Sequence, residues 1–294
     1  MKIYNLGSMN IDYVYQVDHF VSAGETLSSE NMAIFPGGKG LNQSVALAKA
    51  GACVIHGAIV GEGGELLLDA LGQAGADVSR IEKRSGSSGH TIIQVDKTGQ
   101  NCILLFPGTN YAIDEYYIER FLSDAQKDDI LLLQNEISAL DKVFAIAHKK
   151  QMQIAFNPSP YDERIKELPL SYVKWWFCNE IEGKALFGSS EPREIAKSFV
   201  QQYPDSCLIL TLGEAGSVFV SGDAYITQPA YKVKAVDTTA AGDTFTGYFL
   251  SAVTKGENVA AALKLASKAA AITVSRPGAS SSIPTNQEVQ DIHL

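Results

Sequence analysis

The chain has 294 residues, with 24 Lys and Arg against 33 Asp and Glu, and a net charge of −9 at pH 7. Such an acidic chain argues against nucleic-acid binding, because contacts with phosphates need a basic face. Apolar residues make up 46% of the sequence and charged residues 19%, which is typical of a globular protein and excludes a disordered one. The length allows one large α/β domain or two smaller ones.

The four cysteines form no C-x-x-C pair, which argues against a zinc ribbon and against a disulfide scaffold. No apolar run approaches the roughly 18 residues that a membrane span requires. The first eight residues read as a strand entering a turn and not as a cleavable signal. We therefore expect a cytoplasmic protein with reduced thiols and no membrane partner.

Short apolar runs alternate with helical stretches, a pattern typical of a mostly parallel sheet covered by helices. Some runs, such as Ile-Leu-Leu-Leu at 130–133, are continuously apolar, as expected where both faces of a strand are buried. The predicted strands span residues 3–7, 53–60, 130–134, 153–156, 175–178 and 207–212. The predicted helices span residues 41–50, 65–74, 141–150 and 193–202, with further helices after residue 242.

Two inserts, at about residues 11–36 and 89–107, break this alternation. The second insert reads as a hairpin with strands at 90–95 and 101–106. Four short strands from the two inserts are expected to form a small, half-exposed sheet over one edge of the main domain. Such a sheet is suited to act as a lid, a dimer surface or both. We find no linker or internal repeat, so we expect a single domain over residues 1–294.

The most informative motif is Asp-Thr-Thr-Ala-Ala-Gly-Asp-Thr-Phe at residues 237–245, between a predicted strand and a predicted helix. Its small residues leave backbone N–H groups exposed at a helix N-terminus, where the helix dipole favours an anion. Asp243 is then expected beside a phosphoryl group held by those N–H groups. The alternative is an N-capping aspartate after a glycine turn. The length and small residues of the motif favour anion binding.

A second glycine-rich segment, Pro-Gly-Gly-Lys-Gly-Leu-Asn-Gln, occupies residues 36–43. It is not a Walker A loop, because Gly40 stands where that motif needs Ser or Thr. It is either a plain glycine turn before a helix or a backbone pressed against a polyhydroxylated ligand. Residues 61–64 lack the last glycine of a dinucleotide fingerprint, and neither a G-x-S-x-G elbow nor an H-E-x-x-H motif occurs.

Taken together, six motifs resemble those of the ribokinase-like sugar kinases, in the same order from residue 3 to about residue 284. They are two sugar-binding turns at 7–12 and 37–42, an N-x-x-E motif at 179–182, a nucleotide loop at 211–216, the anion hole with its catalytic aspartate at 237–243, and the loop at 275–279 before the last helix. This resemblance implies a three-layer α/β fold with a mostly parallel central sheet and a small β-sheet lid. It also implies ATP-dependent phosphorylation of a sugar hydroxyl.

The resemblance further implies a set of site residues. Asp243 would be the general base, with an anion hole formed by the backbone N–H groups of Ala240, Ala241, Gly242 and Asp243. The sugar would contact Asn10, Asp12, Gly38, Lys39, Gly40, Leu41, Asn42, Glu136 and Asp243. ATP would contact Asn179, Thr211, Leu212, Gly213, Glu214, Ala215, Gly216, Gly242, Asp243 and Ser267. Fixed carboxylates and amides suit a sugar, because a site that hydrogen-bonds a hydroxyl rejects analogues that lack it.

Two cations follow from the same resemblance. The five histidines lack the spacing of a metal site, so we expect hard cations on oxygen ligands. Magnesium, carried in by ATP, would be held through water by Asn179 and Glu182. A potassium ion would lie beside the anion hole, held mostly by backbone oxygens of Asp237, Thr239, Thr273, Arg276, Gly278 and Ser282.

The acceptor is less sharply defined than the reaction. Ribose, giving ribose 5-phosphate, is expected because Asp12 and Asn42 suit vicinal hydroxyls. Deoxyribose, a ketohexose or a nucleoside are alternatives, since Leu41, where the family usually has Ala, either narrows the pocket or packs into the core. A catalytically silent sugar or nucleotide sensor is a further alternative, but such a protein has no need of Asp243. The lid sheet is expected to form a homodimer.

Overall fold

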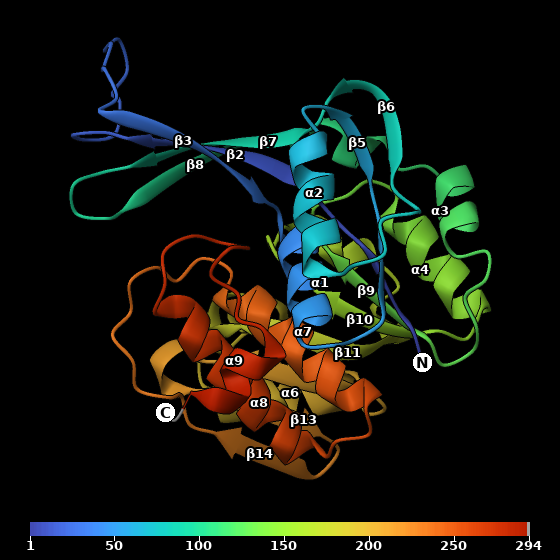
Figure 1. The fold of residues 1–294 in the computed structure, drawn as a ribbon. Helices are drawn as coiled ribbons and strands as arrows, with labels where there is room; N and C mark the ends of the chain where they lie inside the picture. The colour runs from blue at the N-terminus through green and yellow to red at the C-terminus, as the bar shows by residue number, and fades with distance from the viewer. Residues whose placement is uncertain (293–294) are drawn as a thin grey trace.

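The computed structural model describes residues 1–292, and its body is built on one eight-stranded sheet of order β14-β13-β12-β11-β10-β9-β1-β4 (Figure 1). The parallel strands are β1 (Ile3–Leu6), β4 (Val54–Gly57), β9 (Ile130–Gln134), β10 (Gln153–Asn157), β11 (Val173–Asn179) and β12 (Cys207–Thr211). At one edge, β13 (Ser217–Ser221) and β14 (Ala224–Gln228) continue the sheet with antiparallel pairing.

The central strands are buried on both faces, which explains their continuous apolar runs. In β9, Ile130 and Leu132 belong to one hydrophobic cluster, whereas Leu131 and Leu133 belong to the other, because successive side chains of a strand alternate. The first cluster is covered by α1 (Lys39–Lys49), α2 (Glu65–Ala74), α7 (Ala241–Thr254), α8 (Val259–Val274) and α9 (Asn286–Asp291). The second is covered by α3 (Glu115–Phe121), α4 (Leu140–Lys149), α5 (Glu180–Phe187) and α6 (Pro192–Gln202). The three-layer prediction is confirmed.

One predicted strand, residues 53–60, is wrong as a single element. It is divided into β4, which belongs to the main sheet, and β5 (Ile59–Glu62), which leaves the sheet and pairs with β6 (Glu82–Ser87). The division falls at Gly57, which pairs with Leu6, the last residue of β1. Beyond that point the chain has no neighbouring strand to follow. The sequence of β6, Glu-Lys-Arg-Ser-Gly-Ser, lacks apolar alternation and was not predicted.

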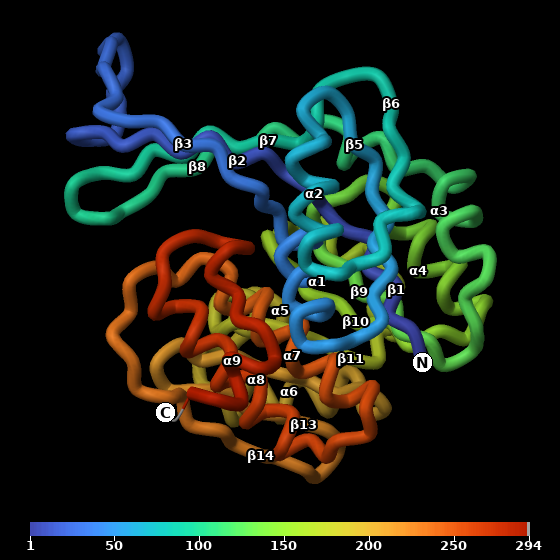
Figure 2. Tube along the Cα trace, viewed as in Figure 1, coloured from blue at the N-terminus to red at the C-terminus, as the bar shows by residue number. Residues whose placement is uncertain are grey.

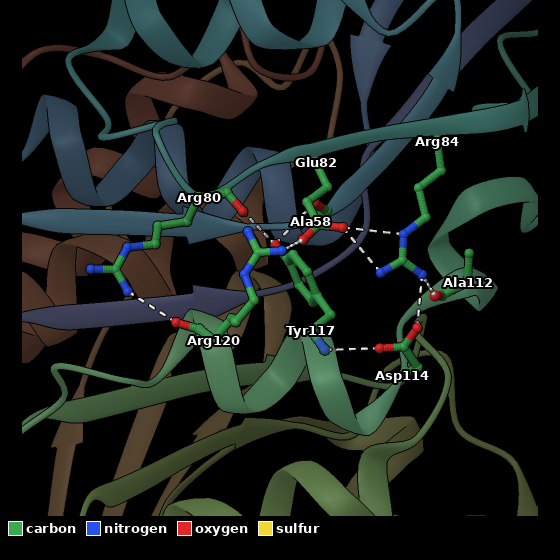
Figure 3. A network of polar contacts seen from close by, with 8 residues as sticks. All are labelled: Ala58, Arg80, Glu82, Arg84, Ala112, Asp114, Tyr117 and Arg120. Carbon is green, nitrogen blue, oxygen red and sulfur yellow. Dashed lines mark hydrogen bonds and ion pairs between the residues drawn. The ribbon is translucent and has the colours of Figure 1, made fainter.

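Polar contacts fasten β6 to α3 (Figure 3). Arg84 donates to Glu82 at 3.0 Å and to Asp114 at 2.9 Å. Arg120, on α3, pairs with the second oxygen of Glu82 at 2.7 Å. Because β6 leads directly into the next insert strand, these ion pairs fix the point from which the small sheet leaves the body.

The two inserts form a four-stranded sheet of order β3-β2-β7-β8, as predicted. Its strands are β2 (Asn10–Gln16), β3 (Asn31–Gly37), β7 (Gly89–Val95) and β8 (Asn101–Phe106). Figures 1 and 2 show this small sheet extending beyond the body, with the β2–β3 and β7–β8 connections at its far end. Paired residues share a face, which defines a pocket face of Asp12, Thr91, Ile93, Ile103 and Leu105. The outer face carries Met32, Ile34, Ile92, Leu104 and Phe106.

Within residues 1–292, no helix combines the length and the apolar character needed to cross a bilayer.

Candidate active site

A cavity of about 430 Å³ lies between the carboxyl ends of the parallel strands and the pocket face of the small sheet. Asn157, Asn179 and Thr211 come from the ends of three neighbouring strands, the edge at which open α/β sheets bind ligands. The predicted site residues that line this cavity are Asn10, Asp12, Gly38, Lys39, Asn42, Glu136, Asn179, Glu182, Thr211, Thr239, Ala240, Ala241, Gly242 and Asp243.

Asp12 stands on the pocket face and is half-buried. Thr91 Oγ1 donates to Asp12 Oδ1 at 2.6 Å. On the neighbouring strand β3, a Cβ at Gly37, which pairs with Asn10, would come within 1.9 Å of Asp12 Oδ2, so glycine leaves room for the carboxylate. Burial raises the pKa of Asp12 to about 6, with a contribution from Glu136, against the lowering effect of the Thr91 hydrogen bond.

Asn10 is oriented by a residue that the sequence did not indicate. Asn110, buried in the turn after β8, donates from Nδ2 to Asn10 Oδ1 at 2.8 Å. Its own Oδ1 accepts from the Met9 N–H at 3.0 Å. Because the oxygen of Asn10 is thereby engaged, its amide nitrogen is the group left to donate into the cavity.

The glycine-rich segment brings the start of α1 against the turn after β1. A Cβ on Gly40 would lie 2.5 Å from backbone atoms of Gly7 and Ser8, so the two segments touch through their main chains. Lys39 and Asn42 line the cavity, whereas Leu41 is fully buried in the hydrophobic cluster beneath. Gly40 and Leu41 do not line the cavity, so its lining gives no support to the sugar contacts predicted for these two residues. The helical period turns residue 41 towards the core.

Lys39 and the carboxylates of Glu136, Glu182 and Asp243 line the same cavity. The Glu136 carboxylate accepts from Ser8 Oγ and from the backbone N–H of Lys39, the latter at 3.2 Å. Burial raises the pKa of Glu136, partly offset by the charge of Lys39. Burial alone would lower the pKa of Lys39, but the carboxylates of Asp243, Glu136 and Glu182 outweigh it, and that pKa is raised. Lys39 is therefore held in its charged form.

The N-terminus of α7 faces the cavity. Ala240 has a left-handed backbone, with a φ of 61°. The Ala241 N–H donates to Thr238 O at 3.3 Å, and Ala241 also lines the cavity. Within residues 1–292, the N–H groups of Gly242 and Asp243 have no acceptor. A Cβ on Gly242 would meet nothing within 4 Å, so an anion has room to approach these two N–H groups.

The Asp243 carboxylate lies beside that helix end and is held at both oxygens. Asn42 Nδ2 donates to Oδ2 at 3.1 Å, and Gln43 Nε2 donates to Oδ1 at 2.9 Å. Both donors come from consecutive residues of α1. Gln43 belongs to the glycine-rich segment, but its contact with Asp243 was not predicted. The sequence does not show which face of α1 packs against α7.

The N-x-x-E motif forms a capping box at the start of α5. Asn179 Oδ1 accepts from the Glu182 N–H, and Glu182 Oε2 accepts from the Asn179 N–H, both at 2.9 Å. One carboxylate oxygen of Glu182 is not used by this box. Asn179 and Glu182 both line the cavity, so oxygen ligands of the kind that magnesium prefers face the space between α5 and α7.

Only some of the residues predicted to contact ATP line this cavity. Thr211 lines it, whereas residues 212–216 form a turn beyond it. Gly216, at the end of that turn, has a φ of 103°, and a Cβ there would lie 2.1 Å from Gln228 O. Ser267 is buried in α8 and does not line the cavity.

The predicted potassium ligands lie on two segments that Asp237 ties together. Its Oδ1 accepts from the Thr239 N–H at 2.9 Å and its Oδ2 from the Gly278 N–H at 3.0 Å. The Arg276 side chain points elsewhere and pairs with Glu288 at 2.7 Å. The side chains of Thr273 and Ser282 already have protein partners. The Thr273 hydroxyl is hydrogen-bonded to that of Thr244, and the Ser282 hydroxyl donates to Ala279 O.

Comparison with known proteins assigns the chain to a family. A model of the pfkB family carbohydrate kinases matches residues 2–286. The chain belongs to the pfkB family of carbohydrate kinases. The expected family, fold and class of activity, transfer of a phosphoryl group to a carbohydrate, are thereby confirmed.

Three relatives of this carbohydrate kinase are informative. A ribokinase from Haemophilus influenzae is 37% identical over 294 residues, covering 96% of this chain and 95% of the relative. A deoxyribokinase from Salmonella typhi is 31% identical, covering 99% of this chain and 98% of the relative. The structure of Arabidopsis thaliana ribokinase complexed with ribose and ATP is 27% identical, has a TM-score of 0.89, and covers 98% of this chain and 97% of that one.

Proposed function

We propose that this protein is an ATP-dependent kinase that phosphorylates the primary hydroxyl of ribose and yields ribose 5-phosphate. The similarity to a ribokinase and to a structure holding ribose and ATP supports this acceptor and this phosphoryl donor. The observation that carries the proposal is a single cavity in which Asp12 and Asn42 lie with Asp243 and the N-terminus of α7. Hydroxyl-binding groups, a base and an anion site are thus combined.

In this proposal, Asp243 accepts the proton of the primary hydroxyl as its oxygen attacks the γ-phosphoryl group of ATP. The N–H groups of Gly242 and Asp243 donate to the oxygens of the group being transferred. Lys39, held in its charged form beside Asp243, adds positive charge to the same region. Phosphoryl transfer depends mainly on such positioning and charge stabilisation.

Deoxyribose is the second candidate acceptor, favoured by the similarity to a deoxyribokinase. A coupled assay of ATP consumption with ribose, deoxyribose, fructose, ribulose, adenosine and pseudouridine separates the candidates. We expect the highest kcat/KM for ribose, with fructose at least about tenfold lower, because a site that binds hydroxyls discriminates against wrong patterns of them. A nucleoside or a hexose at the head of the ranking would refute ribose and leave the kinase assignment intact.

Sugar binding is expected to depend on the protonation of Asp12. Since its pKa is raised to about 6, Asp12 is ionised above that pH and protonated below it. An ionised carboxylate accepts hydroxyl hydrogen bonds more strongly, so we expect the Kd of ribose to rise about tenfold between pH 7 and pH 5. Titration calorimetry measures this directly. Asp12→Asn should bind weakly at every pH; if the wild-type Kd stays constant over this range, Asp12 does not bind the sugar as a carboxylate.

Magnesium is proposed to be held through water by Asn179 and Glu182, and when bound it neutralises phosphate charge. Glu182→Gln tests this cleanly, because Gln also serves as the third residue of a capping box, so α5 keeps its start. We expect the magnesium concentration for half-maximal activity to rise about tenfold or more, with the KM of ribose unchanged. Identical magnesium activation curves for the two proteins would contradict the assignment.

A potassium ion is proposed beside the loop that leads into α7. Supporting this, Asp237 joins that loop to the segment around Gly278, so one ion contacting both segments through backbone oxygens would steady the N–H groups of Gly242 and Asp243. Such an ion acts by preorganising the donors and takes no part in proton transfer.

The small sheet is proposed to act both as a lid and as the contact of a homodimer. Ile103 and Leu105 of the pocket face would cover the bound sugar. The outer face exposes Met32, Ile34, Ile92, Leu104 and Phe106, and Leu104 is 68% exposed. A contiguous apolar surface of this kind is typical of a protein contact, and a second copy of the same face would cover it.

A further inference from the structure

Buried amide side chains connect the interior of the protein to Asp243. Gln43 is fully buried, and its Nε2 donates to Asp243 Oδ1 at 2.9 Å and to Asn157 Oδ1 at 3.2 Å. Its Oε1 accepts from Gln134 Nε2 at 2.6 Å. The same nitrogen of Gln134 donates to Asn5 Oδ1 at 3.0 Å. Both hydrogens and the oxygen of the Gln43 amide are therefore engaged.

The direction of these hydrogen bonds is set from the far end. Asn5 Nδ2 donates to Gly40 O and to Ser44 Oγ, both at 2.8 Å, so its oxygen faces Gln134. Gln134 must then present its nitrogen to Gln43. If the Gln43 amide were flipped, its oxygen would face the Asp243 carboxylate and its nitrogen would face the nitrogen of Gln134. The flipped form would place one acceptor against another and one donor against another, so a single orientation of the Gln43 amide is favoured.

We propose that Gln43 is a positioning residue for phosphoryl transfer, which holds the carboxylate of Asp243 aimed at the sugar hydroxyl, with Gln134 fixing the orientation of its amide. The proposal rests on the role of Asp243 as the base. Gln43 has no exposed surface and does not line the cavity, so it acts through the groups it holds, which are Asp243 and, by a longer hydrogen bond of 3.2 Å, the cavity-lining Asn157. Its neighbour Asn42 holds the other carboxylate oxygen from the cavity side.

The test distinguishes an effect on the orientation of Asp243 from effects on ribose binding and on the stability of the fold. Gln43→Met keeps an unbranched side chain of similar length but removes both donors. We expect the single-turnover rate of phosphoryl transfer, measured by rapid quench with ribose and ATP, to fall about 10²-fold, since a small misplacement of a reacting group has effects of that size. The Kd of ribose should change less than about twofold, because Gln43 does not touch the cavity.

A double-mutant cycle identifies the partner through which Gln43 acts. In an Asp243→Asn background, Gln43→Met should lower the residual rate no further, because residues that act as a unit are non-additive. An equal fall in both backgrounds would overturn the proposal, as would a wild-type rate for Gln43→Met. If instead Asp243→Asn alone keeps the wild-type rate, the proposed base is wrong, and that result is distinct from a failure of Gln43.

Two further variants keep the test decisive. Gln134→Met leaves Gln43 in place but frees its oxygen, and we expect a fall of about three- to tenfold, again absent in the Asp243→Asn background. If Gln43→Met does not fold, Gln134→Met provides the test in its place. A wild-type rate for Gln134→Met would then overturn the proposal. Ser44→Ala is the matched control on α1, because Asn5 keeps its bond to Gly40 O. It should lower the melting temperature without changing the rate; a fall equal to that of Gln43→Met would show a merely structural network.

Discussion

Replacing Asp243 by Asn is expected to lower kcat by about 10²–10⁴-fold, the usual cost of losing a general base. Asn has the shape of Asp but cannot take the hydroxyl proton. The sugar is also bound by residues on other elements, among them Asp12 and Asn42, so the Kd of ribose should stay close to that of the wild type. Steady-state kinetics with titration calorimetry therefore gives a loss confined to kcat.

Asp141→Asn is a matched control for this variant. Asp141 lies in the first turn of α4, which begins after Ala139 in a left-handed conformation, just as Asp243 lies in the first turn of α7 after Ala240. Both substitutions remove a charge that favours a helix N-terminus, but Asp141 is exposed and outside the cavity. The kcat of Asp141→Asn should equal that of the wild type. Near-wild-type turnover by Asp243→Asn would remove the proposed mechanism.

Replacing Gly40 by Ala should damage the site without touching any group that binds sugar. The new Cβ would lie 2.5 Å from backbone atoms of Gly7 and Ser8, so α1 must move away from the turn after β1. That movement carries Asn42 and Lys39 with it. We expect kcat/KM to fall about 10²-fold and the free energy of unfolding to drop by about 1–3 kcal/mol.

Gly72→Ala supplies the comparison for this change. Gly72 lies inside α2, and a Cβ there would meet nothing within 4 Å. The same substitution at that position should raise the free energy of unfolding by about 0.5–1 kcal/mol, because Ala is the better helix former, and should leave kcat/KM unchanged. If Gly40→Ala behaved like Gly72→Ala in chemical denaturation and in kinetics, close contact at Gly40 would not be required.

The layers and the place of the site were predictable because they depend on local patterns. The apolar run of β9 indicated a strand buried on both faces, and α2 has the predicted bounds, Glu65–Ala74. Amphipathic periodicity reports burial directly. The small residues before Asp243 indicated an exposed helix N-terminus in the same way. Parallel strands place their carboxyl ends at one edge, which made a site containing Glu136 and Asn179 foreseeable.

The sequence by itself thus determined the alternation of strands and helices, the small sheet and the residue types available for sugar and phosphate. Only the tertiary structure decided which of these groups meet. Gln43 and Asp243 are 200 positions apart, and Asn10 and Asn110 are 100 apart. Leu41 lies in the core while Asn42 lines the cavity, because the packing of α1 on α7 sets the rotation of that helix. Such contacts depend on how separate elements pack together, and no local pattern along the chain encodes that packing.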